Sequence, residues 1–235
     1  MKIINAEWEK RNLGVTAQEV DIESGDSISD IKEALACLIA QYRVVRVPSG
    51  MVAIHFALEK LGYNFIEAMT CLEVKSESYN GGLKQYGLLN QVEQEYLMKI
   101  ISTGFFNTDR ISLDSFFSSK DAANRYINWI DNERKRGAVI ISLLNDSLVV
   151  GFSVIRQHVD DKEVFISSLS GIFPEHAGNG YSSLIAGCGL AYVKDNGGRV
   201  LRTAVSCNNI ASLKGHIKGG YLPVSTCYVF VKHEN

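Results

Sequence analysis

Residues 170–183, SGIFPEHAGNGYSS, have the composition of an anion-binding turn. A hydrophobic run over residues 164–173 ends at Pro174, and Gly178 and Gly180 then open a long helical pattern. Backbone amides at the start of a helix lack intrahelical acceptors and lie at the positive end of the helix dipole, and glycines let a pyrophosphate approach closely. A plain strand-to-helix connection explains these residues equally well. The Lys-Ser/Thr pair of a P-loop is missing, as is a G-x-G-x-x-G run after an early strand.

The elements that follow this turn must position it. The pattern predicts a strand over residues 200–206, a helix that begins at the Asn208-Asn209 pair and ends at Lys218, and a last strand over residues 225–232. The order is therefore strand, glycine turn, helix, strand, helix, strand.

Two segments of this stretch resemble motifs of the GNAT superfamily of N-acetyltransferases. Residues 174–184 resemble its acetyl-CoA-binding motif, commonly Q/R-x-x-G-x-G/A, and residues 209–221 (NIASLKGHIKGGY) resemble its N-x-x-A-x-x-x-Y-x-x-x-G-F segment. Glu175 replaces the usual Gln or Arg, and His216 replaces the tyrosine that protonates the thiolate. The resemblance implies an α/β protein with a GNAT fold: a mixed central sheet with flanking helices, preceded by a smaller α/β N-terminal domain.

A narrower resemblance extends over most of the chain. Residues 8–14 (WEKRNLG) and 109–130 (DRISLDSFFSSKDAANRYINWI) are similar to segments of bacterial dTDP-amino-sugar N-acyltransferases, including dTDP-4-amino-4,6-dideoxygalactose acetyltransferases. This resemblance implies transfer of an acyl group from acetyl-CoA, or from a short hydroxyacyl-CoA such as 3-hydroxybutyryl-CoA, to the amine of a dTDP-linked amino sugar. The product would enter lipopolysaccharide or another surface polysaccharide. No metal is implied.

The resemblance also implies site residues for the acyl-CoA. We expect the cofactor-binding residues to be Ser170, Ile172, Phe173, Ala177, Gly178, Asn179, Gly180, Tyr181, Ser182, Ser183, Asn209 and Lys214. Asn209 also suits a helix cap, and Lys214 suits a solvated helix face equally well.

Two residues are candidates for the chemical step. A thiol has a pKa of about 8.5 and an imidazole about 6.5, so the imidazolium of His216 would protonate a thiolate readily. The alternative for His216 is a place on a helix face with no catalytic role. Gly171 lies in mid-strand, where a glycine often marks a bulge or a close approach of another backbone, and a freed amide there would polarise the thioester carbonyl.

The acceptor site is expected where residues 109–125 cross the sheet. The Arg110 guanidinium suits a nucleotide diphosphate, and Asp114 suits the sugar or its amine. Arg125, the last residue of this segment, is also expected to bind the substrate. The alternative is a structural pair between Arg110 and Asp114. Trp8 and Trp129 suit stacking on a base or sugar, or packing in the core. No residue can be named as the base for the amine.

Composition limits the other possibilities. The chain has 235 residues, 46% of them hydrophobic, and a net charge of −2, so bulk electrostatics do not favour nucleic acid or an anionic membrane. The five cysteines show no metal-ligand spacing and suit buried, reduced thiols. No apolar segment is long enough for a bilayer, so we expect a cytoplasmic protein, with a homodimer possible. An acetyltransferase of protein or polyamine amines and a non-catalytic acyl-CoA-binding module remain as alternatives.

We expect two domains, an N-terminal α/β domain over residues 1–87 and a GNAT acyltransferase domain over residues 88–235. Residues 53–63 (AIHFALEKLGY) share the layout of residues 212–221, which suggests that the first domain is a partial copy of the second. Common helix-cap chemistry explains this echo almost as well. The other expected elements are strands at 15–22, 42–47, 64–74 and 164–173, helices at 29–41, 49–61 and 121–136, a linker at 75–87, a crossover segment at 88–103 and a hairpin of 139–144 with 147–155.

Overall fold

The computed structural model describes residues 1–234. The strands are β1 (Lys2–Asn5), β2 (Ala17–Asp21), β3 (Tyr42–Pro48), β4 (Asn64–Lys75), β5 (Tyr86–Leu88), β6 (Val139–Asn145), β7 (Leu148–Gln157), β8 (Val164–Ile172), β9 (Val200–Ser206) and β10 (Leu222–His233). The α-helices are α1 (Glu7–Leu13), α2 (Ile28–Ala36), α3 (Val52–Lys60), α4 (Gln91–Ser102), α5 (Arg110–Leu113), α6 (Ser119–Lys135), α7 (Leu184–Asp195) and α8 (Ile210–Lys218). Two 3-10 turns, η1 (Pro174–His176) and η2 (Tyr181–Ser183), separate β8 from α7. Within residues 1–234, no helix combines the length and apolar character needed to span a bilayer.

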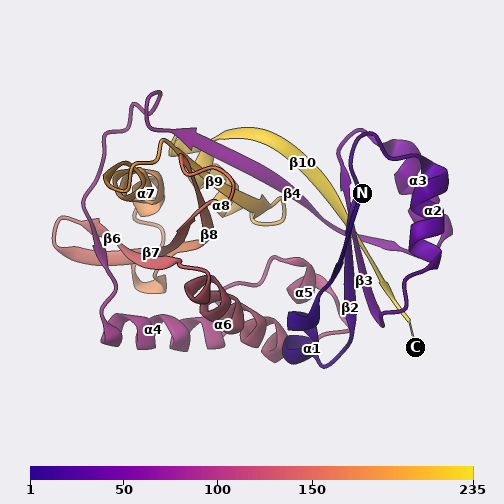
Figure 1. The fold of residues 1–235 in the computed structure, drawn as a ribbon. Coiled ribbons are helices and arrows are strands. Elements are labelled where there is room, and N and C mark those ends of the chain that lie inside the picture. The colour runs from indigo at the N-terminus through magenta and orange to yellow at the C-terminus, as the bar shows by residue number, and fades with distance from the viewer. Residues whose placement is uncertain (235) are drawn as a thin grey trace.

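The strands form one mixed sheet in the order β1-β2-β3-β10-β4-β9-β8-β7-β6-β5. The β2–β3 and β8–β9 pairs are parallel, and the other pairs are antiparallel. Helices flank this sheet, as Figure 1 shows. The expected mixed central sheet with flanking helices is therefore confirmed.

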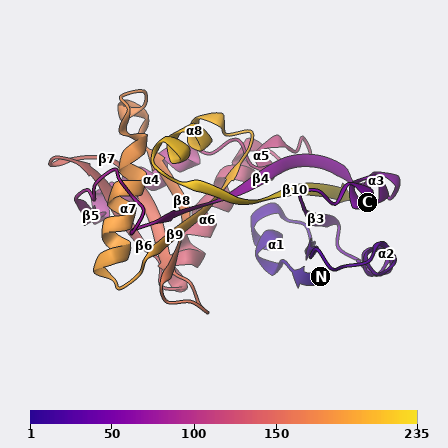
Figure 2. The ribbon, with the colours of Figure 1, turned by 90° about the horizontal axis from the view of Figure 1, so that it is seen from above.

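Strands β4 and β10 join the two ends of the sheet. β4 lies between β10 and β9, although it comes from the N-terminal part of the chain. β10 is the last strand of the chain, yet it lies between β3 and β4 and pairs with both. Figures 1 and 2 show the two long strands running side by side from one end of the molecule to the other. Each part of the chain thus contributes one strand to the other part's half of the sheet.

The C-terminal half of the sheet is packed on both faces. Helix α7 covers one face through a cluster that includes Ile141, Leu190 and Leu201. Helices α4 and α6 cover the other face through Leu97 and Ile130, among others. Neighbouring residues of each strand point to opposite faces, so this part of the sheet is hydrophobic on both sides.

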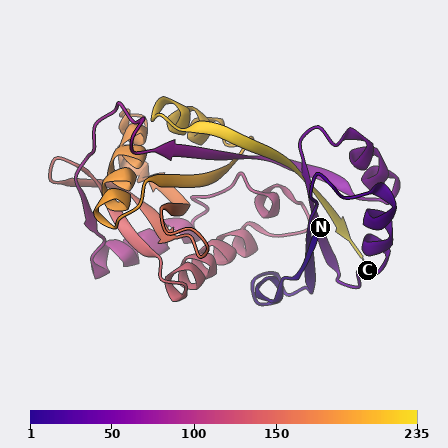
Figure 3. The same ribbon diagram turned by 45° about the horizontal axis from the view of Figure 1, so that its top comes forward.

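The N-terminal half has two smaller cores. Helices α2 and α3 pack on β2, β3 and β10 through residues such as Leu35, Leu58 and Val45. The opposite face is covered near Ala6, Ile111 and other residues of α1, α5 and α6. In Figure 3, α2 and α3 lie at the end of the molecule opposite α7.

Local signals in the sequence account for many element ends. Ser27 caps α2 by accepting a hydrogen bond from the Asp30 amide at 3.1 Å, and Asn209 caps α8 through the Ser212 amide at 3.0 Å. The β6–β7 hairpin turns at Asn145 and Asp146, and Asp146 has a φ of 53°. The cap at Asn209 and the hairpin turn were expected, and both are confirmed.

Several expectations about secondary structure were wrong or incomplete. The helix expected over residues 29–41 ends at Ala36. The crossover segment contains α4, and the linker ends in the short strand β5. Strand β1 and helix α1 lay outside the expected elements, and α1 starts after Ala6, whose side chain makes no cap.

The C-terminal ends of helices α3 and α8 match in detail. Gly62 follows α3 with a φ of 81°, and Gly220 follows α8 with a φ of 91°. In both cases the next residue is a buried tyrosine, Tyr63 or Tyr221, whose amide donates to a carbonyl five residues earlier. A glycine at this left-handed position is a frequent helix ending. Each helix then leads into one of the two long strands, β4 or β10.

Candidate functional site

Strands β8 and β9 separate along their length. They pair in parallel from Val164 with Val200 to Ile166 with Arg202, and no further pairing is present between them in residues 1–234. β8 nevertheless continues to Ile172 and β9 to Ser206. The edge of β8 beyond Ile166 therefore faces an opening between two neighbouring strands.

A β-bulge accompanies this separation. Val154 of β7 faces Leu169, while Ile155 faces Ser167, so Ser168 is the extra residue of β8. Bulges bend the strand that contains them and re-aim its side chains. The Ser168 hydroxyl donates to the buried carboxylate of Glu133 at 2.6 Å, which fixes the bulged residue against α6.

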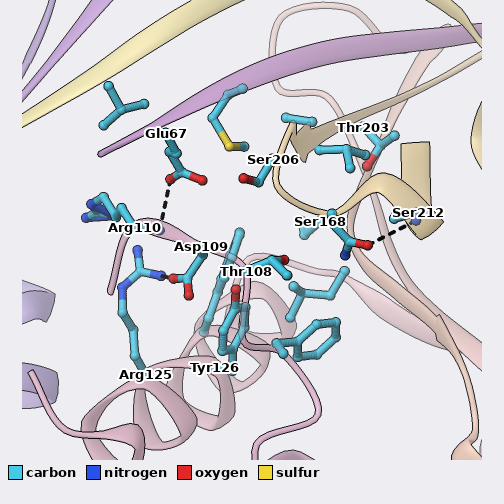
Figure 4. Close-up of a pocket in the computed structure, with 18 of the residues that line it drawn as sticks. Glu67, Thr108, Asp109, Arg110, Arg125, Tyr126, Ser168, Thr203, Ser206 and Ser212 are labelled. Carbon is cyan, nitrogen blue, oxygen red and sulfur yellow. Dashed lines mark hydrogen bonds and ion pairs between the residues drawn. The ribbon is translucent and has the colours of Figure 1, made fainter. Parts of the chain in front are cut away.

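The opening leads into a cavity of 370 Å³. Its walls come from both parts of the chain: α1, β2, β3 and β4, the segment before α5, helix α6, the separated strands β8 and β9, β10, and helix α8. Figure 4 shows Ser168, Thr203 and Ser212 on one side, and Glu67, Asp109 and Arg125 on the other. The cavity therefore connects the strand opening with a charged region near the N-terminal strands.

The glycine-rich turn lies between β8 and α7, and it follows the free edge of β8 directly in the chain. Gly178 and Gly180 have φ values of 82° and 80°, which L-residues rarely adopt. The backbone N–H groups of Gly178, Asn179 and Gly180 have no hydrogen-bond acceptor in the described part of the chain. Free amides before the N-terminus of a 12-residue helix are suited to an anion such as a pyrophosphate.

Gly171 does not mark the bulge. It lies opposite Phe152 in the β7–β8 register, three residues from the extra residue Ser168. A Cβ atom at Gly171 would lie 2.7 Å from the Phe105 ring, so the glycine makes room for an aromatic side chain. The predicted bulge at Gly171 is wrong in position, and the predicted oxyanion role of its amide stays a prediction.

His216 lies on α8 and lines the cavity. Its Nδ1 atom is 2.8 Å from the Ser212 carbonyl oxygen. A carbonyl only accepts, so Nδ1 carries the hydrogen, and Nε2 of the neutral ring is left as an acceptor. Nε2 is buried and has no partner among the described residues. Burial lowers the pKa of His216 below its usual 6.5, and the bond to the Ser212 carbonyl opposes this shift.

The lysine predicted for a phosphate is not at a cavity, but two others are. Lys214 is exposed on α8 and lines neither described cavity. A second cavity of 270 Å³ lies beside Ser183, and Lys84 and Lys218 line it together with Gly219 and Gly220. Both lysines therefore lie at a cavity that also borders the start of helix α7. Lys84 is in the linker, where sequence patterns assign no contact, so its role was missed.

At the far end of the cavity, arginines and carboxylates form a buried ion-pair network. The Arg110 Nη2 atom donates to Glu9 Oε1 at 2.8 Å and to Glu19 Oε1 at 2.6 Å. Arg125 Nε donates to Glu9 Oε1 at 2.8 Å. Burial opposes ionisation of Glu19, but the Arg110 and Arg46 guanidiniums outweigh it and lower the pKa of Glu19 to about 2.

This network changes the expectation for the acceptor residues. Arg110 is 5% exposed and binds two carboxylates through Nη2, while its Nε has no partner among the described residues, so its predicted contact with a diphosphate stays a prediction. Asp114 does not line the cavity and instead accepts from His233 Nε2 at 2.8 Å. The alternative pair between Arg110 and Asp114 is therefore wrong. Arg125 lines the cavity, so its predicted contact with the substrate stays a prediction.

Aromatic side chains form part of the same wall. Trp8 and Trp129 both line the cavity, and the Trp129 ring stacks on Tyr126 at 5.9 Å. The Arg125 guanidinium lies 5.6 Å from the centre of the Trp129 ring. A flat ligand could therefore contact aromatic faces here, next to the ion-pair network.

Glu67 is the site residue that sequence reasoning missed. It lies on β4, is 4% exposed, and lines the cavity, with its carboxylate directed toward Arg110 and Ser206 in Figure 4. Its Oε1 atom accepts from the Arg110 backbone amide at 3.0 Å. The available signal was an acidic residue inside an otherwise apolar strand pattern, FIEAM.

Comparisons with known proteins identify the fold. No protein-family model matches the sequence, and no curated protein matches it. Among solved structures, a GCN5-related N-acetyltransferase from Sphaerobacter thermophilus is similar with a TM-score of 0.63 at 10% identity, over 99% of this chain and 75% of that chain. A tandem GNAT protein of the clavulanic acid biosynthesis pathway has a TM-score of 0.57 at 14% identity, over 93% of this chain and 77% of that chain.

A third similar structure is a region described as a GCN5-related glucosamine N-acetyltransferase in a fungal multi-domain GH3 β-N-acetylglucosaminidase. Its TM-score is 0.60 at 12% identity, over 98% of this chain and 31% of that chain. The three likenesses show that this chain has the GNAT fold, which confirms the fold expected from the sequence. Identities of 10–14% leave the reaction and the substrates to be argued from the site.

Proposed function

We propose that this protein is a CoA-dependent N-acyltransferase, with one active site where β8 and β9 separate. The observation that carries this proposal is the combination of an unpaired β8 edge with free amides at the adjoining glycine turn. An acyl-CoA carries an extended pantetheine arm with two amides and a pyrophosphate. The arm suits the β8 edge, much as a peptide adds to a sheet, and the pyrophosphate suits the turn.

In this proposal the β8 residues, the glycine turn and Asn209 keep the cofactor-binding roles expected from the sequence, whereas Lys214 lines neither described cavity. The β8 residues Ser170 and Ile172 border the opening, and Ser182 lies against Gly215 of α8, where an added Cβ would come within 2.9 Å. This close contact joins the turn to the helix that carries His216. The cavity beyond the opening has room for the acyl group and an acceptor amine.

His216 would transfer a proton within the site. Its neutral ring presents Nε2 as an acceptor, which suits the proton released by the amine nitrogen as the bond to the carbonyl carbon forms. The resulting imidazolium would then protonate the departing thiolate, since a thiol has a pKa of about 8.5 and an imidazole about 6.5. The Ser212 carbonyl stabilises the imidazolium through Nδ1–H.

For the acceptor we propose an amine on a nucleotide-linked amino-dideoxy sugar. The cavity combines aromatic faces, hydroxyls such as Thr203 and Ser206, and carboxylates, which together suit a sugar that carries an ammonium group. The fungal glucosamine N-acetyltransferase region shows that a structure with this fold is described as acting on an amino sugar. The dTDP group and the surface polysaccharide are proposed on the sequence resemblance alone.

We further propose that residues 1–87 are a partial copy of the GNAT unit without a site of its own. The matched endings of α3 and α8 and the exchange of β4 and β10 support this proposal, and one similar structure is a tandem GNAT protein. In the copy, β2 and β3 stay paired over Ala17–Asp21, so they leave no opening. Leu58 takes the place of His216 relative to the glycine and tyrosine.

The test is turnover with a panel of dTDP- and UDP-linked amino sugars, with acetyl-CoA or 3-hydroxybutyryl-CoA, measured as release of free thiol. We expect release with one amino sugar and none with its hydroxyl analogue. Release with a peptide or polyamine, and with no amino sugar, would identify a protein or polyamine amine as the acceptor. Tight CoA binding without release for any amine would favour a non-catalytic acyl-CoA-binding module.

A further inference from the structure

We propose that Glu67 is the general base that deprotonates the acceptor ammonium group. This inference rests on the proposed N-acyltransferase function, and it assigns a catalytic role to a residue of the N-terminal part of the chain. Glu67 reaches the cavity because β4 crosses into the C-terminal half of the sheet.

The Glu67 carboxylate is held in place through one oxygen, and its other oxygen has no partner among the described residues. Its Oε1 atom accepts from the Arg110 amide at 3.0 Å, which fixes the orientation of the group. Its Oε2 atom is buried and has no hydrogen-bond partner among the described residues. A buried carboxylate oxygen without a partner costs free energy, so its retention calls for a ligand or a reaction.

The position of Glu67 on β4 directs it into the site. Antiparallel pairing of β4 with β9 begins at Met69 with Ser206, so Glu67 lies two residues before the ladder starts. Val229 of β10 is its partner on the other side and also lines the cavity. Figure 4 shows the carboxylate beside Ser206, with Asp109 below it.

The other carboxylates that line the cavity are occupied. Glu19 is paired with Arg110 and Arg46 at 2.6 and 2.9 Å. Asp109 caps α5 and is paired with Arg125 at 3.5 Å. Glu67 alone among these three forms no ion pair within residues 1–234. Among these three carboxylates, Glu67 is therefore the one that is free to take up a proton without breaking an ion pair.

The charges around Glu67 come from several elements. Burial raises the pKa of Glu67 above its usual 4.5, the Ser206 hydroxyl opposes this, the Asp109 carboxylate adds to it, and Arg110 opposes it. Tyr126 of α6 and Cys227 of β10 also face it and are neutral at pH 7, because burial raises the pKa of both. A carboxylate with a raised pKa is a stronger base than one with the usual pKa.

In the proposed step the acceptor nitrogen loses two protons, one to Glu67 and one to the sulfur. Glu67 Oε2 takes one proton from the acceptor ammonium, which leaves a lone pair on nitrogen and a neutral Glu67. The lone pair forms the N–C bond, the C–S bond breaks, and its electron pair leaves on sulfur. The second proton of the nitrogen reaches the sulfur through His216 Nε2. Glu67 then returns its proton to solvent.

The test compares Glu67→Gln with Glu73→Gln in the full chain. Gln keeps an oxygen for the Arg110 amide but accepts no proton. Glu73 is the matched control, because it lies on the same strand and lines neither described cavity. Its carboxylate pairs with Arg202 at 2.7 Å. With the amino sugar that supports release by the unmodified protein, we expect kcat to fall about a hundredfold or more for Glu67→Gln. Glu73→Gln should stay within about threefold, and calorimetry should give both variants an unchanged Kd for CoA.

Two further readouts separate a base from a structural residue. For the unmodified protein, kcat/KM should fall as pH drops through the pKa values of Glu67, above 4.5, and of His216, below 6.5, and Glu67→Gln should keep only the fall that comes from His216. Because the native pKa of Glu67 is raised, its charge opposes folding at pH 7, and the thermal midpoint of Glu67→Gln should therefore rise at pH 7 but not below pH 4.5. A midpoint that falls at pH 7 would show a structural role and overturn the inference.

The outcomes for the two proposals are distinct. Release by the unmodified protein with a Glu67→Gln rate within about threefold would overturn the role of Glu67 and leave the N-acyltransferase proposal intact. Absence of release from the unmodified protein with every amine would remove the proposed function, and the inference with it.

Discussion

Replacing Gly180 by alanine probes the conformation of the turn with little steric interference. Gly180 has a φ of 80°, and a Cβ built on it meets no atom within 4 Å. The cost therefore comes from the left-handed backbone alone, about 1–2 kcal/mol for an L-residue. The turn can either keep its conformation, at the expense of stability, or relax, at the expense of CoA binding.

The two responses are measured separately. If the turn relaxes, its free amides move apart, and calorimetry should show a 5- to 30-fold weaker Kd for CoA, since about 1.4 kcal/mol is a factor of ten. If the turn keeps its conformation, the Kd stays the same and the free energy of unfolding falls by about 1–2 kcal/mol. The two losses should sum to the cost of the strained backbone.

Gly197→Ala is the matched control. Gly197 has a φ of 77°, has no atom within 4 Å of a built Cβ, and follows the C-terminus of the same helix, α7. It should show the loss of stability with no change in CoA affinity. A Gly180→Ala protein with unchanged stability and unchanged affinity would refute the left-handed turn and the cradle built on it.

Four further results are expected. Glu9→Gln, at a 0% exposed residue of the ion-pair network, should lower the free energy of unfolding by about 3–5 kcal/mol in denaturant titrations. Gly171→Ala should cost about 1–3 kcal/mol, and a double variant with Phe105→Ala should lose less than the sum of the single variants. Lys84→Gln should weaken binding of CoA severalfold at low salt and less at high salt, because the lost contact is electrostatic. Because burial lowers the pKa of His216, the unfolded chain binds its proton first, so stability should fall as pH drops below 6.5, more steeply than in His216→Asn.

Elements with local signals could be predicted from the sequence. Ser27, Asn209 and the Gly62-Tyr63 pair set helix ends through hydrogen bonds to residues a few positions away, and those ends are where they were expected. Helix α4 also has such a signal that went unused, because Asn90 and Glu93 form a capping box. Helix α1 has none, since Ala6 offers no side-chain acceptor.

The exchange of β4 and β10 lay beyond sequence reasoning. Both strands read as ordinary apolar strands, and their pairing depends on partners far away in the chain, such as Val229 with Glu67. A strand pattern shows which residues face the core but not which strand lies next to it. The expected two-domain division stays a proposal, and the structure joins the two parts in one sheet.

The site divided in the same way. The glycine turn and His216 were predicted from local motifs, and the turn directly follows the free edge of β8, while His216 lines the cavity. The bulge at Ser168 and the Arg110 network depend on contacts across the sheet, so their positions were misjudged. Glu67 reaches the cavity only through the strand exchange, which explains why no base could be named from the sequence.

A crystal structure of the protein with CoA tests the central claim most directly. We expect the pantetheine arm between β8 and β9, with its amides bonded along residues 168–172 and the pyrophosphate on the amides of Gly178, Asn179 and Gly180. CoA bound elsewhere, with the β8 edge still free, would contradict the assignment of this opening as the acyl-CoA site.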